Sequence, residues 1–485
     1  MKHPWGIVLF QRDLRIVDNT AFLAACKECE QVIGIFVFNP KQVSSNNTFK
    51  SNNAVAFMVE SLRSLDEDLQ QAGGALHCFY GEPDSVVRSV LHELRVGKSE
   101  AILYYNRDIT PFARRRQESL DKIGIPIVAC DDYYLASMNS VLSSSEKPYT
   151  KFTPYASRFL TMLSEGDIVI DQPNLSKPSK LKCKIVSMNL KSQKKLDWVA
   201  DKIIDLKHVS PYRLVLGGRE KALSRMKEVP PIVSKYQVTR NDLSDKTTQL
   251  SAYIKFGCVS IREVYYFFKK NIDPAARKSL IRQLLWRDFY AQVLFHNPSN
   301  LGDSMKEAYR DMDWVKGADA RIRLKAWKNG TTGFPIVDAG MRELVSTGYM
   351  HNRTRLIAGS FLPKTLSVDW MDGEKHFARY LSDYDPASNN GNWQWVAGTG
   401  VDSQPYFRIL NPRLQSERYD EDATYIKKWI PELRTMSAKD IHKWCEGKIC
   451  GEARLSSIKY PRPIVDYKAQ KEKALSMYKA AYESS

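Results

Sequence analysis

The order of short apolar runs and helical stretches constrains the fold of this chain more than any other feature. Apolar runs of strand length occur in the first 135 residues, at 6–10, 31–38, 75–81, 101–105 and 125–130. Stretches with helical periodicity, such as 52–73 and 83–95, lie between them. Alternation of this kind predicts a parallel sheet covered by helices on both faces. From about Pro211 onward the pattern is almost wholly helical, so we expect a second, unlike domain.

A segment rich in serine, lysine and proline separates these two regions. It includes the stretches 143–155 and 175–195, which show no clear strand or helix period. A connection of this length is unusual inside one domain. We therefore expect an α/β domain over residues 1–135, a long surface connector over 136–210 and an all-helical domain over 211–485.

Charge and composition limit the partners and the compartment. The formal net charge is +17, which favours a nucleic acid partner, although solvated lysines alone would give the same balance. No apolar run approaches the ~20 residues that span a bilayer. The N-terminus lacks the features of a signal peptide, so we expect an intracellular protein without a membrane partner. Eight cysteines in 485 residues do not indicate a disulfide scaffold.

The stretch Leu381–Trp395, LSDYDPASNNGNWQW, has the most unusual composition. It combines two carboxylates, two adjacent amides, a glycine and two tryptophans. Carboxylates and amides are costly to bury without partners. Gly391 suggests a close backbone approach, and tryptophan offers a flat surface for stacking. The mixture favours a binding site, although a polar loop beside two core tryptophans would have the same sequence.

This stretch belongs to an ordered series of long motifs. FQRDLRIVDNTAF lies at 10–22, TGFPIVDAGMRELVSTGYMHNRTR at 332–355 and GTGVDSQPYFRILNP at 398–412. The series resembles the photolyase/cryptochrome family over essentially the whole chain, and class I cyclobutane pyrimidine dimer photolyases most. The resemblance implies an FAD-binding helical domain and light-driven repair of UV-damaged DNA. In that reaction reduced FAD donates an electron to a flipped-out lesion.

The resemblance also assigns residues to FAD. Tyr236 and the run TTQLS match the clamp for the phosphates and ribitol, although TTQLS alone is more typical of a helix N-cap. Arg355 and Asp383 match the ion pair at the flavin edge. An amide at Asn389, the position that faces flavin N5, tolerates the reduced anionic flavin and favours repair. The full set is Tyr236, Thr247, Thr248, Gln249, Leu250, Ser251, Arg287, Asn352, Arg355, Asp383, Asp385 and Asn389.

Three tryptophans match the chain that photoreduces oxidised flavin. Trp393 and Trp370 resemble its inner members, and Trp314 resembles the outer one. The segment between Trp314 and Trp327 is about three residues longer than the family pattern. Trp327 is therefore the alternative outer member, and core packing is the other role open to each of these rings.

The stretch Ile281–His296 predicts a helix with two different faces. Ile281, Leu284, Leu285 and Phe289 form an apolar face, whereas a polar and aromatic stripe contains Gln283, Trp286, Arg287 and Tyr290. Trp286 and Trp395 resemble the two tryptophans that stack on the flipped lesion. With Gln283 and Asn352 they form the predicted catalytic set. Arg240, Arg353 and Arg408 match positions near the DNA backbone, where arginines bind phosphates.

Gln283, Asn352 and Leu356 bear on the type of lesion, because cyclobutane dimer photolyases and (6-4) photolyases differ at these positions. Gln283 stands where dimer photolyases usually carry Glu, and Leu356 where many carry Met. The (6-4) photolyases need two histidines, which would fall at Asn352 and Leu356, so a histidine pair is absent here. His351 is offset by one position, and a structural role is expected for it. We expect cyclobutane dimer repair, with (6-4) repair or a non-repairing cryptochrome photoreceptor as alternatives.

Many members of the family bind a second, light-harvesting chromophore. The run YYNRDITPFARRRQ lacks the glutamate that holds folate, and Asp108, Lys255 and Cys258 match the deazaflavin pattern. Deazaflavin is therefore favoured over methenyltetrahydrofolate, and an empty site is the alternative. No metal site is indicated, and we expect a monomer.

Overall fold

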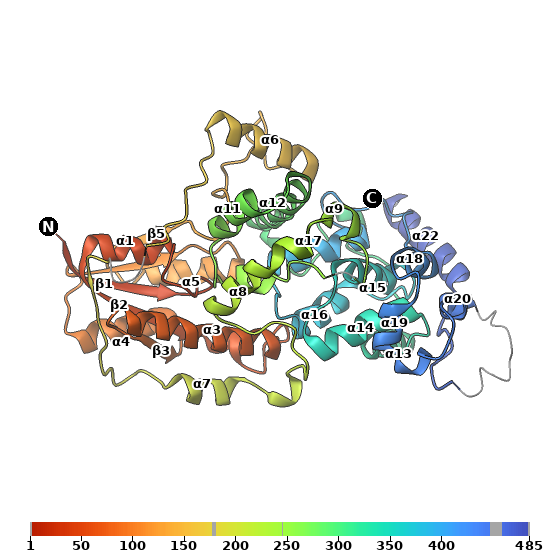
Figure 1. Ribbon diagram of the computed structural model, residues 1–485, viewed down its shortest axis with the longest axis horizontal. Coiled ribbons are helices and arrows are strands. Elements are labelled where there is room, and N and C mark those ends of the chain that lie inside the picture. Colours follow the sequence, from red (N-terminus) through yellow and green to blue (C-terminus); the bar gives the residue numbers. More distant parts are fainter. Residues whose placement is uncertain (1, 177–180, 245, 447–457, 484–485) are drawn as a thin grey trace.

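The computed structural model describes residues 2–176, 181–244, 246–446 and 458–483. Its first part, at the red and orange end of the chain in Figure 1, contains a parallel sheet. The strand order is β3-β2-β1-β4-β5. These strands span His3–Phe10 (β1), Cys29–Phe38 (β2), Leu76–Tyr80 (β3), Ala101–Asn106 (β4) and Ile127–Cys130 (β5). All five predicted strands are confirmed. A sixth strand, β6 (Lys184–Ile185), pairs with β2 and was not expected.

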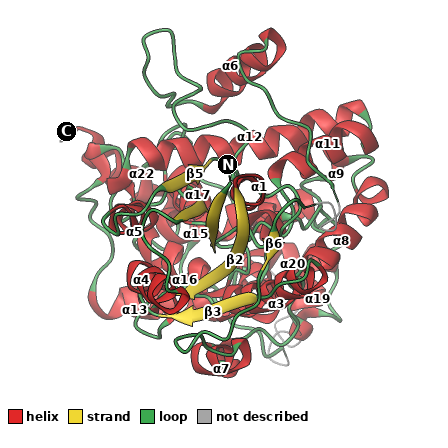
Figure 2. Cartoon of the chain, turned by 90° about the vertical axis from the view of Figure 1, so that its left-hand side faces the viewer, coloured by secondary structure: helices red, strands yellow, loops and turns green. Residues whose placement is uncertain are grey.

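Helices cover both faces of this sheet, as the alternation of strands and helices predicts (Figure 2). On one face, Val8 and Phe10 of β1 pack in a cluster with α1 and α3, whereas Ile7 and Leu9 pack with α4 and α5 on the other. Successive side chains of a strand point to opposite faces, so a wholly apolar strand needs cover on both. The helices of this part are α1 (Thr20–Glu28), α2 (Pro40–Val43), α3 (Asn52–Gln71), α4 (Pro83–Leu94) and α5 (Pro111–Asp121).

The segment 136–210 contributes more than a surface connection. It contains α6 (Phe152–Glu165) and α7 (Leu196–Ile203), in addition to β6. Phe152, Tyr155 and Phe159 of α6 are buried in the same apolar cluster as residues of α12. Helix α6 thus buries one face in this cluster, whereas Ser157 and Leu160 on its other face are exposed. The domain boundaries stay a prediction.

The part from residue 211 onward is helical in the described residues, as expected. Its centre is an apolar cluster built from α13 to α17 and α19. The helices are α8 (Arg219–Ile232), α9 (Tyr236–Thr239), α10 (Ser251–Lys255), α11 (Ile261–Asn271), α12 (Pro274–His296), α13 (Gly317–Asn329), α14 (Pro335–Thr347), α15 (Asn352–Lys364), α16 (Trp370–Tyr380), α17 (Pro386–Ala397), α18 (Pro412–Tyr419), α19 (Thr424–Trp429), α20 (Ala438–Lys443) and α22 (Tyr467–Glu483). Short 3-10 helices lie at Leu206–His208, Pro298–Asn300, Glu307–Tyr309, Pro431–Leu433 and Trp444–Glu446. No helix in the described ranges is both long and apolar enough to span a bilayer.

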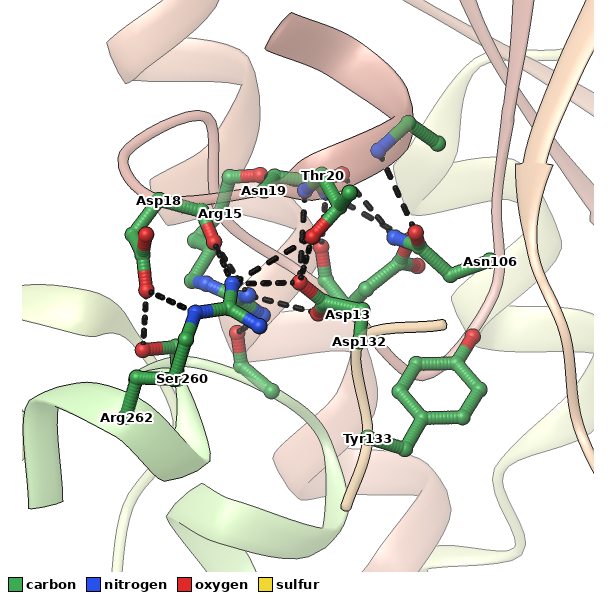
Figure 3. Close-up of polar contacts among 12 residues, drawn as sticks. Asp13, Arg15, Asp18, Asn19, Thr20, Asn106, Asp132, Tyr133, Ser260 and Arg262 are labelled. Atoms are coloured by element: carbon green, nitrogen blue, oxygen red, sulfur yellow. Dashed lines mark hydrogen bonds and ion pairs between the residues drawn. The ribbon is translucent and has the colours of Figure 1, made fainter. Parts of the chain in front are cut away.

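A buried polar network joins the sheet to the helical part (Figure 3). Asp132, just after β5, lies 2.6 Å from Arg15 Nη2 and 2.8 Å from Arg262 Nη2. Arg262 belongs to α11, and its Nε also lies 3.0 Å from Asp18 Oδ2. Burial alone would raise the pKa of Asp132, but the two arginines outweigh it and lower that pKa to about 2. The two arginines therefore keep the buried Asp132 carboxylate charged at the junction.

Candidate active site

A cavity of about 560 Å³ lies among α10, α12, α15 and α17. Both the polar stripe of α12 and the stretch from Asp383 to Trp395 face it. The predicted site residues in its lining are Tyr236, Arg240, Thr247, Thr248, Gln249, Leu250, Ser251, Lys255, Gln283, Trp286, Arg287, Asn352, Arg353, Arg355, Asp383, Asp385, Asn389, Trp393 and Trp395. Residues from distant parts of the sequence thus come together at one place.

The run TTQLS forms part of the cavity wall as a loop. Arg225 holds it from behind, because its Nε and Nη2 donate hydrogen bonds to the carbonyls of Thr248 (2.8 Å) and Thr247 (2.7 Å). Helix α10 begins at Ser251 without a side-chain cap, so the N-cap alternative is not observed. The Ser251 hydroxyl instead donates to Asp383 Oδ2 at 2.6 Å. The loop therefore presents hydroxyl and amide groups to the cavity.

Arg355 and Asp383 form the expected ion pair. Arg355 Nη2 lies 2.9 Å from Asp383 Oδ2, and Nη1 lies 3.2 Å from Oδ1. Arg355 Nε donates to the Met350 carbonyl at 2.8 Å, which fixes the guanidinium. Burial lowers the pKa of Arg355, but the Asp383 carboxylate outweighs it and the net direction is upward. A two-pronged pair of this kind is both strong and geometrically specific.

Asp385 is held by a residue that sequence reasoning missed. It caps α17, because its Oδ1 accepts a hydrogen bond from Ser388 N at 3.0 Å. Its Oδ2 accepts a 2.8 Å bond from Arg12, which follows β1 at the other end of the chain. Burial raises the pKa of Asp385, but Arg12, Arg287 and Lys255 together hold it well below its usual range. Arg12 and Asp385 are 373 residues apart in the sequence, so the role of Arg12 becomes visible only in the structure.

The two amides of α17 are oriented by Glu374 of α16. Asn389 Nδ2 donates to the Glu374 carbonyl at 3.2 Å, and Asn390 Nδ2 donates to Glu374 Oε1 at 3.1 Å. Because Nδ2 is engaged in this bond, the side-chain oxygen Oδ1 of Asn389 is available to the cavity, which Asn389 lines. Burial raises the pKa of Glu374 to about 7. Gly391 explains the close packing of this helix, because a Cβ there would lie 2.2 Å from the Tyr290 ring.

The three tryptophans of the predicted electron-transfer chain lie at different places relative to the larger cavity. Trp393 lines the cavity, whereas Trp370 is buried outside it and donates to Ser304 Oγ at 3.4 Å. Trp314 packs against Tyr478, with ring centroids 6.1 Å apart. In the described residues, Trp393 makes ring contacts with Phe377 (4.9 Å) and Trp327 (6.0 Å). Trp327, the alternative outer member, therefore packs directly against Trp393, one of the two predicted inner members.

The predicted DNA contacts lie around the mouth of the cavity or beyond it. Arg353 Nη2 donates to Asn241 Oδ1 at 2.6 Å. Arg240 and Arg408 are exposed, and Arg408 lies outside the cavity lining. Gln283 is exposed at the cavity, and its amide donates to the Ser279 carbonyl at 3.4 Å. His351 has the expected structural role, because its Nδ1 accepts from Arg353 N at the start of α15.

A second cavity of about 110 Å³ lies at the carboxyl ends of β1 and β2. Arg12, Asp108, Arg116 and Lys255 are in its lining, so Lys255 borders both cavities. Burial, followed by the Arg12 charge, lowers the pKa of Lys255 to about 8. Cys258 lines neither cavity. Its buried thiol donates to Ser61 Oγ at 3.3 Å.

Family models match both halves of the chain. Residues 6–175 match the DNA photolyase model, and residues 280–480 match the FAD binding domain of DNA photolyase. A deoxyribodipyrimidine photo-lyase of Alkalihalophilus pseudofirmus is 34% identical, over 97% of this chain and 97% of its own. The chain belongs to the DNA photolyase family. The resemblance seen in the motifs is thus confirmed.

Solved structures of this family share the fold. An archaeal photolyase from Sulfolobus tokodaii with two FAD molecules is 34% identical, with a TM-score of 0.83 over 98% of this chain and 100% of that one. A cryptochrome from Synechocystis is 26% identical, with a TM-score of 0.82 over 98% and 100%. The fold is thus shared by photolyases and by a cryptochrome, whereas the sequence is more similar to the photolyases.

Proposed function

We propose that this protein repairs cyclobutane pyrimidine dimers in UV-damaged DNA, with FAD in the larger cavity. The observation that carries the proposal is the meeting of two residue sets in one cavity. One set is the Arg355–Asp383 pair with Asn389, and the other is Trp286 with Trp395. Bound reduced FAD would supply the electron, and light the energy, for splitting the dimer.

The chain's own groups suit this cofactor. Thr247 to Ser251 and Tyr236 would bind its phosphates and ribitol through hydroxyl and amide donors. Arg355 and Asp383 would hold the flavin edge. The side-chain oxygen of Asn389, whose amide is oriented by Glu374, would face flavin N5. Arg287 and the buried charge of Asp385 complete this polar wall. The residues would position the cofactor and keep water from it.

Binding of DNA is supported by aromatic and cationic groups around the same cavity. Trp286 and Trp395 would stack on the two bases of a flipped-out dimer. Arg240, Arg353 and Arg408 would bind phosphates on either side, and the net charge of +17 would draw DNA toward the protein. Gln283 would donate its amide to a carbonyl of the dimer.

The choice of lesion follows from the side chain at position 352. Asn352 lines the cavity where a (6-4) photolyase would need histidine for proton transfer. Position 352 therefore favours repair of cyclobutane dimers over repair of (6-4) photoproducts. A non-repairing cryptochrome remains the second candidate, because Gln283 replaces the usual glutamate and a cryptochrome shares the fold.

We also propose that the smaller cavity takes an antenna chromophore, with deazaflavin favoured over methenyltetrahydrofolate. Asp108 and Lys255 line this cavity and would supply polar contacts. Cys258, which matched the same pattern, is not part of the proposed contact set because it lines neither cavity. Reconstitution with each chromophore, followed by its absorbance spectrum, would test this assignment.

A repair assay tests the main proposal. Purified, photoreduced protein is illuminated with blue light beside two oligonucleotides, one with a cyclobutane thymine dimer and one with a (6-4) photoproduct. Loss of the first lesion alone is expected. Repair of the (6-4) lesion instead would overturn the assignment of the lesion. Survival of both lesions, with normal flavin photoreduction, would favour the photoreceptor.

A further inference from the structure

The indole of Trp286 rests on a second aromatic ring. The Phe152 ring lies parallel to it, with centroids 3.7 Å apart and planes 8° apart. Phe152 is only 1% exposed and is not among the described residues that line the larger cavity, whereas Trp286 is. Phe152 therefore covers the side of the indole that faces away from the cavity.

Arg282 extends this stack by one layer. It lies one helical turn before Trp286 on α12, so the two side chains project from the same face of the helix. The guanidinium Cζ of Arg282 lies 4.7 Å from the centroid of the Phe152 ring. Because the indole occupies one face of that ring, the guanidinium takes the other. A cation over an aromatic face is attractive, by about 0.5–1 kcal/mol for an exposed cation such as Arg282.

The stack is anchored from outside the helical part of the chain. Phe152 is the first residue of α6, and Tyr155 and Phe159 bury this helix in the core cluster that includes α12. Phe289 meets both stacked rings with its edge, at 5.8 Å from Phe152 and 5.7 Å from Trp286. The plane of the indole is thus fixed from its back and from its edge.

We infer that Phe152 is a positioning residue for the flipped-out lesion. It holds the Trp286 indole so that the ring face toward the cavity is already in place when a base arrives. A ring that is fixed beforehand loses little conformational freedom on binding, and this preorganisation strengthens affinity. The inference rests on the proposed function, since it assumes that Trp286 stacks on a base.

Matched leucine substitutions test this role. Phe152→Leu keeps an apolar side chain of similar size but removes the stacking plane. Phe159→Leu is the control, because Phe159 is equally buried on α6 and makes no ring contact in the part of the chain that the structure describes. Phe152→Tyr keeps the ring and serves as the rescue. The measured quantity is the ratio of dissociation constants, in the dark, for an undamaged oligonucleotide and the same oligonucleotide with one cyclobutane dimer.

For Phe152→Leu we expect this preference for the dimer to fall about tenfold, with unchanged affinity for undamaged DNA and unchanged flavin content. Phe159→Leu and Phe152→Tyr should keep the preference. Equal preference in wild type and Phe152→Leu, equal losses in both leucine variants, or no rescue by tyrosine would each overturn the inference. If the wild type itself shows no preference, the proposed function fails first and takes the inference with it.

Discussion

The Arg355–Asp383 pair shows how single residues at this site depend on each other. The Asp383 side chain is 7% exposed and binds both Arg355 and the Ser251 hydroxyl. Replacing Asp383 by Asn would leave the partly buried Arg355 guanidinium without its counter-charge, and about 3–5 kcal/mol is the upper end of that cost because it applies to fully buried pairs. We expect Asp383→Asn to be purified with little flavin, as measured by the ratio of absorbance at flavin and protein bands. Asp372→Asn, at an exposed position of α16, should keep its flavin; equal loss in both would contradict the assignment.

Gln283 allows a gain of activity to be tested. A glutamate, which the usual dimer photolyases carry there, would accept a charge-assisted hydrogen bond from a pyrimidine N–H of the dimer. We expect Gln283→Glu to raise the repair yield per absorbed photon on a dimer-containing oligonucleotide. Lys278→Gln makes the same change in net charge at an exposed position of α12 and should leave the yield unchanged. Unchanged yield in Gln283→Glu would rule out a contact with the lesion at this position.

Most residues in the cavity could be found from motifs, but their supports could not. Asp383, Asn389 and Trp393 stand in one stretch whose composition was already unusual. Arg12 and Phe152 come from other parts of the chain, and only the fold brings them to the site. Local pattern carries no information on a partner that is hundreds of residues away. Motif reasoning therefore identifies the groups at a ligand better than those that hold them.

At the scale of elements, helix α15 carries Arg353 and Arg355 at one end and a fully buried lysine, Lys364, at the other. Lys364 Nζ donates to the Arg408 carbonyl at 3.1 Å, which ties the helix to the loop that bears Arg408. Burial first, and then the charges of Lys306 and Arg408, lower the pKa of Lys364 to about 7. The lysine thus links one helix end to a predicted DNA-binding loop at a cost in stability.

This lysine predicts a pH dependence of stability. Its pKa is lower in the folded protein than in the unfolded chain, so the unfolded chain binds more protons between about pH 7 and pH 10. Stability from this group therefore rises with pH across that window. We expect the free energy of unfolding in urea to rise more from pH 7 to pH 9 in wild type than in Lys364→Met. The exposed Lys439→Met should follow the wild type; parallel profiles for all three would contradict the shift.

Elements with a clear period were predicted well, and those without one were not. The five strands of the sheet and helices α3, α4 and α12 follow from apolar periodicity. Strand β6 has two residues, which is too short for any period to appear. Helix α6 begins within a stretch rich in serine, lysine and proline that shows no clear helical period, so the helix was not predicted. Both misses lie in the segment 136–210, where tertiary contacts decide the structure.

Across the whole molecule, the sheet and the helices are bound together by charge as well as by apolar packing. The single apolar cluster that contains Phe10 and Leu69 also contains Leu284 and Phe289 of α12. Arg15, Asp18 and Asp132 lie at the carboxyl edge of the sheet and meet Arg262 of α11 there. A shared core with a shared ionic network leads us to expect one cooperative unfolding transition for the two parts.

Arg262 is the residue whose loss should weaken this coupling most. It faces two carboxylates that are 6% and 1% exposed, and its own side chain is 14% exposed. Arg262→Met would leave Asp18 and Asp132 with too little positive charge, and removing one partner of a buried pair costs about 3–5 kcal/mol. We expect a loss of that order in the free energy of unfolding. We also expect flavin release, followed by flavin absorbance, and loss of sheet structure, followed by circular dichroism, to occur in separate transitions. Arg107→Met breaks a pair in which both side chains are about half exposed, where the cost should stay below about 1 kcal/mol. Equal, small losses in the two variants would show that the junction is held by apolar packing alone.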